Sequence, residues 1–307
     1  GYAFVDIRPR VNRSRDEKLI NLVFQINEGP RVYIERINIT GNIRTLDKVI
    51  RREMKLAEGD AFNTAKLRRS RQQIRRLGFF DKVDVAQQEG ETPDKVVIDV
   101  DVQEQSTGEL SFGVGISTTE NVVGDVSIRE RNLLGKGQDL KLSLGLSTSK
   151  QEIDLSFTEP YFLDRNVSAG FDIFSRKEDQ QDRSSFDEQS QGFSVRFRFP
   201  ITENLRQGLR YTLRDDTIED IAADTSPFIL VDEGSSVTSS VGYDLVYDTR
   251  DDIFLPTKGV VISGSQELAG LGGDIQFIRS TAKWSYFYAF NRDVVGKLAL
   301  SGGHIIG

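Results

Sequence analysis

The pattern of apolar and polar positions changes character near residue 106. Residues 1–106 combine the two-residue alternation of β-strands with the wider spacing of amphipathic helices. Beyond this point the helical spacing disappears, and roughly eleven segments alternate apolar with polar residues. The chain is therefore predicted to hold two regions of different architecture, a mixed α and β region followed by an all-β region.

The first region predicts the element order β-α-α-β-β after an initial strand. The stretch LINLVFQINEG places alternate apolar residues on one face of a strand, and RVYIERINITGN predicts a second strand that ends at a turn. Thr45 is the expected N-cap of a first helix, and Asn63 that of a second helix with Gly78 at its C′ position. The stretches FFDKVDVAQ and KVVIDVDVQE then predict two further strands.

A weak internal repeat links the initial strand to the last strand of this region. LVFQINEG is similar to VIDVDVQEQ, and Glu28 and Glu104, which lie at the ends of the two strands, are 76 positions apart. A repeat of this length predicts tandem modules. Residues 1–28 are therefore expected to be the C-terminal part of one module, and residues 29–106 a complete second module.

The alternation beyond residue 106 has two candidate explanations. A soluble sandwich buries the apolar face of each sheet, whereas a membrane barrel turns that face to lipid. The polar positions are rich in Gly, Ser and Arg, and long polar connections such as RKEDQQDRSSFDEQS alternate with shorter ones such as RNLLGKG. Short turns on one side and long loops on the other are typical of barrels, so the pattern favours a transmembrane β-barrel.

The composition argues against several kinds of site. The chain has no Cys and one His, so neither a metal site built from these residues nor a serine triad is expected. Its net charge of −7 disfavours nucleic-acid binding. No apolar run is long enough for a transmembrane helix. No cofactor is expected, and no constellation of residues indicates an enzyme.

Two connections combine charges with aromatic and aliphatic residues. They are TEPYFLDRN (158–166) and DTRDDIFLPTKG (248–259). Side chains of this mixed kind suit a membrane–water boundary, so we interpret both as turns on one side of the barrel. Their charges are expected to face water or to pair across neighbouring turns. The marker residues of the two turns are Pro160, Tyr161, Phe162, Asp248, Arg250, Phe254, Pro256 and Gly259.

Residues 39–85 resemble a polypeptide-transport-associated (POTRA) domain. The similarity rests on Gly41-Asn42 after a strand, IRREM in the first helix, Glu58-Gly59 between the helices, and RLGFFDKVDV leading into the next strand. The segments GELSFGVGIST, RERNLLGKGQ, TEPYFLDRN and YDTRDDIFLPTKG then follow in the order expected for the barrel of the Omp85 superfamily. The resemblance covers essentially the whole chain, with a POTRA module at 29–106 and the barrel at 107–307.

The resemblance implies a fold and a function. The implied fold is an α+β POTRA module followed by an antiparallel transmembrane barrel, of which this chain supplies about eleven of about sixteen strands. The implied function is the assembly and insertion of outer-membrane β-barrel proteins without ATP. The implied location is the bacterial outer membrane, with the POTRA domains in the periplasm. Unfolded outer-membrane proteins, periplasmic accessory lipoproteins and outer-membrane lipid are the implied partners.

The resemblance also implies roles for particular residues. In the family the first barrel strand meets the last at a lateral gate, which can open sideways to template a client strand. Glycines in this strand would weaken its packing, as a gate requires, or would merely fit the curvature of the barrel. Glu58 is either a contact for an accessory lipoprotein or an exposed acidic turn residue. The gate strand is expected to include Glu109, Leu110, Ser111, Phe112, Gly113, Val114, Gly115 and Ile116.

Two alternative functions remain open on the sequence alone. Within the superfamily, a translocation-and-assembly protein or a two-partner secretion transporter moves a dedicated client through or beside its barrel. In a different class, a soluble β-rich binding protein would show the same alternation. Partition of the full-length protein into detergent would separate the soluble class from the membrane classes.

Overall fold

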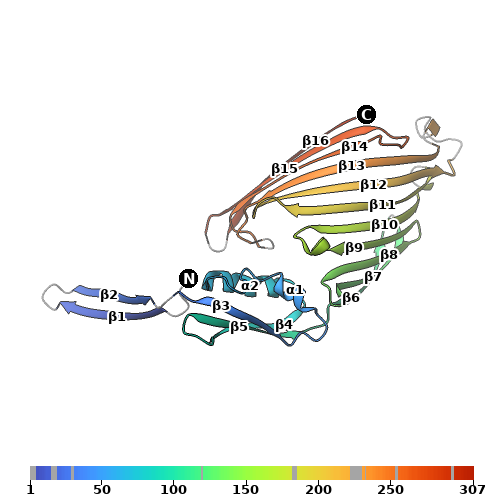
Figure 1. The fold of residues 1–307 in the computed structure, drawn as a ribbon. Helices are drawn as coiled ribbons and strands as arrows, with labels where there is room; N and C mark the ends of the chain where they lie inside the picture. The colour runs from blue at the N-terminus through green and yellow to red at the C-terminus, as the bar shows by residue number, and fades with distance from the viewer. Residues whose placement is uncertain are drawn as a thin grey trace. The chain divides into compact units, whose positions relative to one another are not determined.

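The computed structural model describes residues 5–14, 19–28, 31–118, 120–181, 185–221, 230–231, 233–252, 255–291 and 294–307. The chain divides into two compact units. The first comprises Gly1–Thr107 and Asn132–Gly137, and the second comprises Gly108–Arg131 and Gln138–Gly307. Figure 1 shows mixed helices and strands in the first unit and a large sheet in the second. The predicted order, an α+β module followed by a large antiparallel sheet as in an incomplete barrel, is confirmed.

The first unit contains a three-stranded sheet with two helices. The strand order is β3-β5-β4, in which β5 runs parallel to β3 and antiparallel to β4. This arrangement confirms the predicted order β-α-α-β-β. The elements are β3 (Tyr33–Thr40), α1 (Asp47–Arg51), α2 (Thr64–Arg76), β4 (Phe80–Glu89) and β5 (Lys95–Glu104).

One apolar cluster joins the helices to this sheet. Ile98 and Val100 of β5 are fully buried, and Ile74 of α2 and Phe62, just before α2, are buried with them. The two-residue period of β5 and the helical spacing of α2 each bring one apolar face to the cluster. Burial of these faces is the main force that folds the unit.

The two helices begin differently. The Asn63 side chain accepts a hydrogen bond from the Lys66 N–H at 3.0 Å, so the predicted cap of α2 is confirmed. The N-cap of α1 is Leu46, whose side chain makes no capping bond, and the prediction of Thr45 is wrong. The reason is that the Thr45 hydroxyl accepts a hydrogen bond from the Asn132 amide at 2.8 Å. Among the described residues, neither helix is long and apolar enough to cross a membrane.

A separate antiparallel pair precedes the three-stranded sheet. It consists of β1 (Val5–Ser14) and β2 (Leu19–Glu28). β2 and β5 are offset by 76 positions at both ends, and β1 pairs with β2 in the register in which β4 pairs with β5. Phe24 of β2 is exposed, whereas the corresponding Val100 of β5 is fully buried. The strand register therefore supports the internal repeat expected from the sequence.

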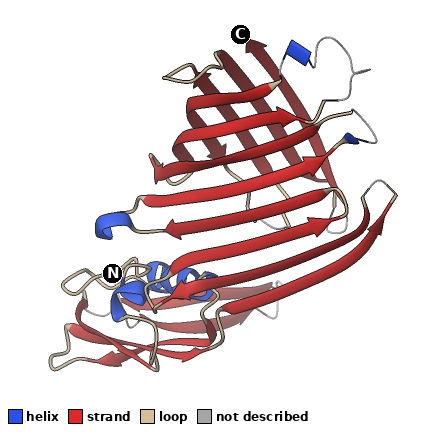
Figure 2. Cartoon of the chain, turned by 90° about the vertical axis from the view of Figure 1, so that its right-hand side faces the viewer, coloured by secondary structure: helices blue, strands red, loops and turns tan. Residues whose placement is uncertain are grey.

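The second unit is one antiparallel sheet of eleven strands, in which each strand pairs with the next along the chain. The number of strands agrees with the number of alternating segments in the sequence. Figure 2 shows the strands side by side. A short 3₁₀ helix, η1 (Phe162–Asp164), lies in one turn. The strands are β6 (Gly108–Ser117), β7 (Asn121–Leu133), β8 (Gln138–Ser147), β9 (Lys150–Glu159), β10 (Ser168–Asp179), β11 (Asp187–Pro200), β12 (Leu205–Glu219), β13 (Gly234–Asp248), β14 (Gly259–Ala269), β15 (Phe277–Ala289) and β16 (Val295–Ile306).

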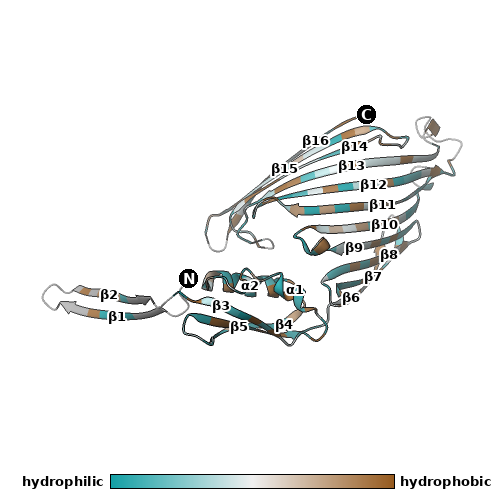
Figure 3. Cartoon of the chain, in the orientation of Figure 1, coloured by the Kyte–Doolittle hydropathy of each residue, from teal (hydrophilic) through white to brown (hydrophobic). Residues whose placement is uncertain are grey.

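The two faces of this sheet differ in polarity. Hydrophobic and hydrophilic residues alternate along its strands (Figure 3). Phe197 of β11 lies opposite Leu209 of β12, and these apolar side chains define one face. Asp172 of β10 lies opposite Ser194 of β11, on the other face. Because the strands keep one register across the sheet, the alternation of each strand adds up to an apolar face and a polar face.

Candidate functional site

The strand β6 lies at one edge of the sheet. Among the residues that the structure describes, its one strand neighbour is β7, and β16 lies at the opposite edge. The backbone groups on the free side of an edge strand can pair with another extended chain. The apolar side chains of β6 are 68% to 92% exposed. They are Leu110, Phe112, Val114 and Ile116.

Two glycines alternate with these apolar residues in β6. A Cβ atom added at Gly115 would have no heavy atom within 4 Å, whereas one at Gly113 would meet the Asp125 side chain of β7. Close packing therefore does not require glycine at position 115. A glycine inside a strand lowers its stability, since it loses more conformational freedom on folding and has no side chain to pack.

The polar face is held together by an arginine that reaches three strands. Arg196 of β11 forms an ion pair with Asp172 of β10. Its guanidinium also donates to Thr158 Oγ1 at 2.6 Å and to Ser156 Oγ at 3.1 Å, both on β9. The Ser194 hydroxyl donates to Asp172 at 3.0 Å. The alternation of Arg196 with Val195 and Phe197 predicts its place on the polar face, but this network depends on the register of three strands.

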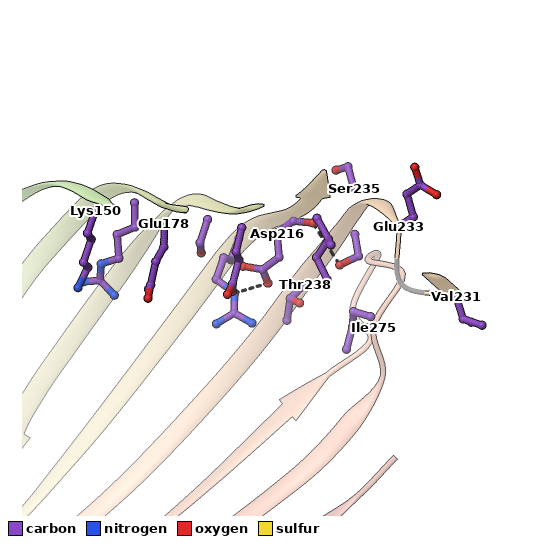
Figure 4. Close-up of a pocket in the computed structure, with 14 residues that line it drawn as sticks. Lys150, Glu178, Asp216, Val231, Glu233, Ser235, Thr238 and Ile275 are labelled. Carbon is purple, nitrogen blue, oxygen red and sulfur yellow. Dashed lines mark hydrogen bonds and ion pairs between the residues drawn. The ribbon is translucent and has the colours of Figure 1, made fainter. Parts of the chain in front are cut away.

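A pocket of about 770 Å³ lies on the polar face, near the ends of β9 to β13. Figure 4 shows Lys150, Glu178 and Asp216 at its lining. Its three cations form ion pairs: Arg214 Nε contacts Asp216 at 2.7 Å, and Lys150 and Arg176 contact Glu152 outside the lining. Among the described residues, no group of His, Cys, Asp or Glu side chains is arranged to hold a metal ion. The lining offers paired charges rather than a set of convergent reactive groups.

The turn between β9 and β10 contains Pro160, Tyr161 and Phe162. The Tyr161 N–H donates to the Glu159 carboxylate at 3.0 Å. The Phe162 ring meets the edge of the Phe197 ring with a centroid separation of 6.1 Å. This contact brings the turn to the apolar face of the sheet, where Phe197 lies. The marker residues of this turn thus have packing and hydrogen-bonding roles in the structure.

The charges of the turn between β13 and β14 pair mainly within the turn, and Asp248 also lies 4.0 Å from Arg206 at the start of β12. The Arg250 guanidinium donates to Asp248 at 2.6 Å. Asp251 accepts from the backbone N–H groups of Thr257 and Lys258, and also from the Thr257 hydroxyl. These hydrogen bonds hold the pKa of Asp251 far below its ordinary value. The charges therefore shape the turn itself.

The rest of this turn is less polar. Pro256 is half-buried and Leu255 is exposed. Gly259 has a φ of +120°, and a Cβ atom there would lie 2.6 Å from the Thr249 carbonyl oxygen, so the position requires glycine. Phe254, the remaining marker residue, lies outside the described residues.

Glu58 lies in the connection between α1 and α2. Its carboxylate accepts a hydrogen bond from Arg51 Nη1 at 2.6 Å, and Arg51 Nη2 donates to the Ile37 carbonyl oxygen at 3.1 Å. The Glu58 backbone N–H and the Arg51 guanidinium together hold the pKa of Glu58 below its ordinary value. Glu58 and Arg51 therefore tie the connection to β3, and both side chains are about half exposed.

The segment 132–137 belongs to the first unit, although it follows β7 along the chain. The buried Asn132 donates to Thr45 and accepts a hydrogen bond from the Gly137 N–H at 2.8 Å. The Leu46 N–H donates to the Gly135 carbonyl oxygen at 2.9 Å. With Arg131 it forms the stretch RNLLGKG, which the sequence predicts to be a short connection between strands and which carries part of the family resemblance. Its structural role depends on contacts far apart in the chain, which local patterns do not reveal.

Comparison with known families agrees with this architecture. Residues 32–105 match the POTRA family, described as a surface antigen variable number repeat. Residues 132–307 match the Omp85 superfamily domain, and this match spans more than half of the chain. The chain belongs to the Omp85 superfamily. The matched ranges coincide with the α+β module and with ten of the eleven strands of the sheet, β7 contributing only its end.

Relatives within the Omp85 superfamily carry a common name. The chain is 34% identical over 290 residues to the "Outer membrane protein assembly factor BamA" of Nitratidesulfovibrio vulgaris, which covers 94% of this chain and 36% of that protein. It is 29% identical over 308 residues to the protein of the same name from Neorickettsia risticii, covering 100% of this chain and 42% of that protein. The chain therefore spans less than half the length of these two relatives.

A solved Omp85 structure has the same fold. It is BamA from Haemophilus ducreyi lacking POTRA domains 1-3, with a TM-score of 0.77 and 24% identity, and the match covers 100% of this chain and 62% of that chain. The two relatives and the family matches indicate the bacterial outer membrane as the location. The resemblance to this superfamily, stated from the sequence, is confirmed.

Proposed function

We propose that the protein of which this chain is part assembles β-barrel proteins into the bacterial outer membrane. The proposal is supported by relatives that are named outer-membrane assembly factors and match nearly the whole of this chain. The observation that carries it in the structure is strand β6, which lies at the sheet edge among the described residues and contains two glycines. An edge strand of this kind offers an extended client chain a place to pair.

The edge strand suggests how assembly proceeds. A client strand would add to β6 by backbone hydrogen bonds, and each further strand of the client would pair with the one before it. Because such bonds involve the backbone, they would tolerate many client sequences. Glu109–Ile116 would form the lateral gate, and Gly113 and Gly115 would lower the free energy needed to separate β6 from the last strand of the full-length barrel.

The apolar face of the sheet supports a membrane setting. Its exposed side chains include Phe197, Leu209 and Tyr243, which lie opposite one another on neighbouring strands. A contiguous apolar surface of this kind is rare on soluble proteins, whereas lipid covers it in a membrane barrel. This feature argues against the soluble binding protein.

The first unit would act on the periplasmic side. Its edge strands could bind an unfolded client as an additional strand. The matching registers of β1–β2 and β4–β5 support the assignment of residues 1–28 to the end of a preceding POTRA module. Glu58 and its partner Arg51 are exposed enough to meet an accessory lipoprotein, and the lowered pKa of Glu58 keeps its charge available.

Depletion of the full-length protein in its native host tests the proposed function. We expect the levels of many different outer-membrane β-barrel proteins to fall together, because each would need the same edge strand to fold. Quantitative proteomics of outer-membrane fractions measures this, with inner-membrane proteins as the control. Loss of a single client would favour a dedicated transporter instead, and unchanged levels would contradict assembly altogether.

A further inference from the structure

Four turns along one side of the second unit each carry an exposed apolar residue. Each joins an odd-numbered strand, from β9 to β15, to the strand that follows it, so in an antiparallel sheet all four lie along one rim. In a turn that faces water, small polar residues would be expected at these positions. The four, named here the rim residues, are Leu163 (75% exposed), Ile201 (50%), Leu255 (81%) and Phe290 (69%).

Leu163 also has an unusual backbone conformation. Its φ is +55°, in the left-handed region that glycine or asparagine normally occupies. The branched side chain therefore adds strain to the turn and, in water, exposes apolar surface as well. An exposed leucine at this position is favourable if its side chain lies in an apolar medium.

At two of these four turns, aromatic contacts continue the apolar face of the sheet to the rim. In the turn that holds Leu163, the Phe162 ring packs against Phe197 on that face. At β15 a row of aromatic rings runs along the strand and ends at the rim. The centroid separations along this row are 6.2, 6.4 and 5.2 Å, between Trp284, Tyr286, Tyr288 and Phe290 in turn. The surface that would face lipid thus extends beyond the strand ends and into the turns.

We propose that the rim residues insert into a lipid surface, at the boundary between headgroups and acyl chains, and fix the depth of the sheet. Charged neighbours such as Asp164, Arg165 and Lys258 would lie among the headgroups. Lipid fits better than a protein partner because the four side chains come from four separate turns and extend the same apolar face. The inference rests on the membrane location of the proposed function and does not depend on client assembly.

Single-cysteine labelling tests this inference, and the absence of Cys from residues 1–307 makes the labelling clean. The full-length protein, with any other cysteine replaced by serine, is placed in vesicles of phosphatidylethanolamine and phosphatidylglycerol. A nitroxide is attached to Leu163→Cys or Leu255→Cys. Its collisions with oxygen, which concentrates in lipid, are compared with its collisions with a water-soluble nickel chelate. We expect collisions with oxygen to exceed those with nickel several-fold at both positions.

Two control positions make the outcomes distinct. Glu203→Cys, in the turn that holds Ile201, should report mainly nickel because its native side chain is exposed and charged. Leu209→Cys, on the apolar face of β12, should report mainly oxygen. If the labels at 163 and 255 collide mainly with nickel while the label at 209 collides mainly with oxygen, the inference is wrong and the proposed function stays intact. If the labels at 163 and 255 are shielded from both reagents, the inference is wrong and these residues contact protein instead. If the label at 209 collides mainly with nickel, the membrane location itself is wrong.

Discussion

Replacing Arg196 with methionine is expected to destabilise the sheet by about 3 kcal/mol. Methionine keeps most of the apolar length of the side chain and removes the guanidinium. Asp172 would then lose its ion pair, and Thr158 and Ser156 would lose the donor that they share. Both members of the ion pair are largely buried, with side chains 17% and 28% exposed, so water compensates only part of the loss. Urea unfolding of the full-length protein in detergent micelles, followed by the gel mobility of the folded form, measures the change.

Arg198→Met is the matched control, because Arg198 lies on the same face of the same strand. Among the described residues its side chain makes no hydrogen bond or ion pair, so its replacement should change the unfolding free energy by less than about 0.5 kcal/mol. Adding Asp172→Leu to Arg196→Met should recover part of the stability, since the unpaired carboxylate would be gone. Equal effects of Arg196→Met and Arg198→Met would contradict the role of the network.

Gly41→Ala is expected to destabilise the POTRA module by about 2–5 kcal/mol. Gly41 has a φ of +86°, and a Cβ atom there would lie 1.9 Å from the Val102 carbonyl oxygen of the neighbouring strand β5. The substitution therefore causes both strain in a left-handed backbone conformation and a clash with the backbone of a buried strand. Hydrogen exchange of the β5 amide groups in the full-length protein measures the free energy of local opening.

Gly59→Ala separates the two contributions. Gly59 has nearly the same φ, +88°, but a Cβ atom there would have no heavy atom within 4 Å. Its replacement should cost only the backbone strain, about 1 kcal/mol. If hydrogen exchange in β5 responded equally to both substitutions, the clash with Val102 would play no part, and the explanation of Gly41 would be wrong.

The elements that could be predicted from the sequence are those that depend on local periodicity. The alternation from Leu140 to Leu146 predicts a strand, and β8 (Gln138–Ser147) contains it. Asn63, Ile74 and Gly78 predict the start, the buried face and the end of α2 because a cap and a helical spacing are local signals. The order of elements and the number of strands follow from such signals.

The contacts that could not be predicted join residues distant in the chain. Thr is a common helix-capping residue, but the Thr45 hydroxyl accepts a hydrogen bond from Asn132, which is 87 residues away. Arg196 alternates like any polar strand residue, and its partners are set by the register of β9, β10 and β11. The marker residues of the two turns were recognised by resemblance, whereas the internal bonds of Asp251 required the three-dimensional structure.

The central claim is that β6 assembles clients because it separates easily from the strand with which it forms the gate. A Cβ atom at position 115 would meet no other atom within 4 Å, so Gly115→Val should cause no clash. Valine should strengthen the pairing of β6 and make opening of the gate about fivefold rarer. Gly145 of β8 is the matched control, since a Cβ atom there makes only an ordinary contact, 3.6 Å from Glu152 Cβ, in a strand paired on both sides.

The most direct measurement is the rate at which an unfolded outer-membrane β-barrel protein folds into vesicles that contain the full-length protein. The account predicts that the wild-type protein and Gly145→Val accelerate folding equally, and that Gly115→Val is about fivefold slower. Equal rates for all three proteins, or no acceleration by the wild-type protein, would contradict it.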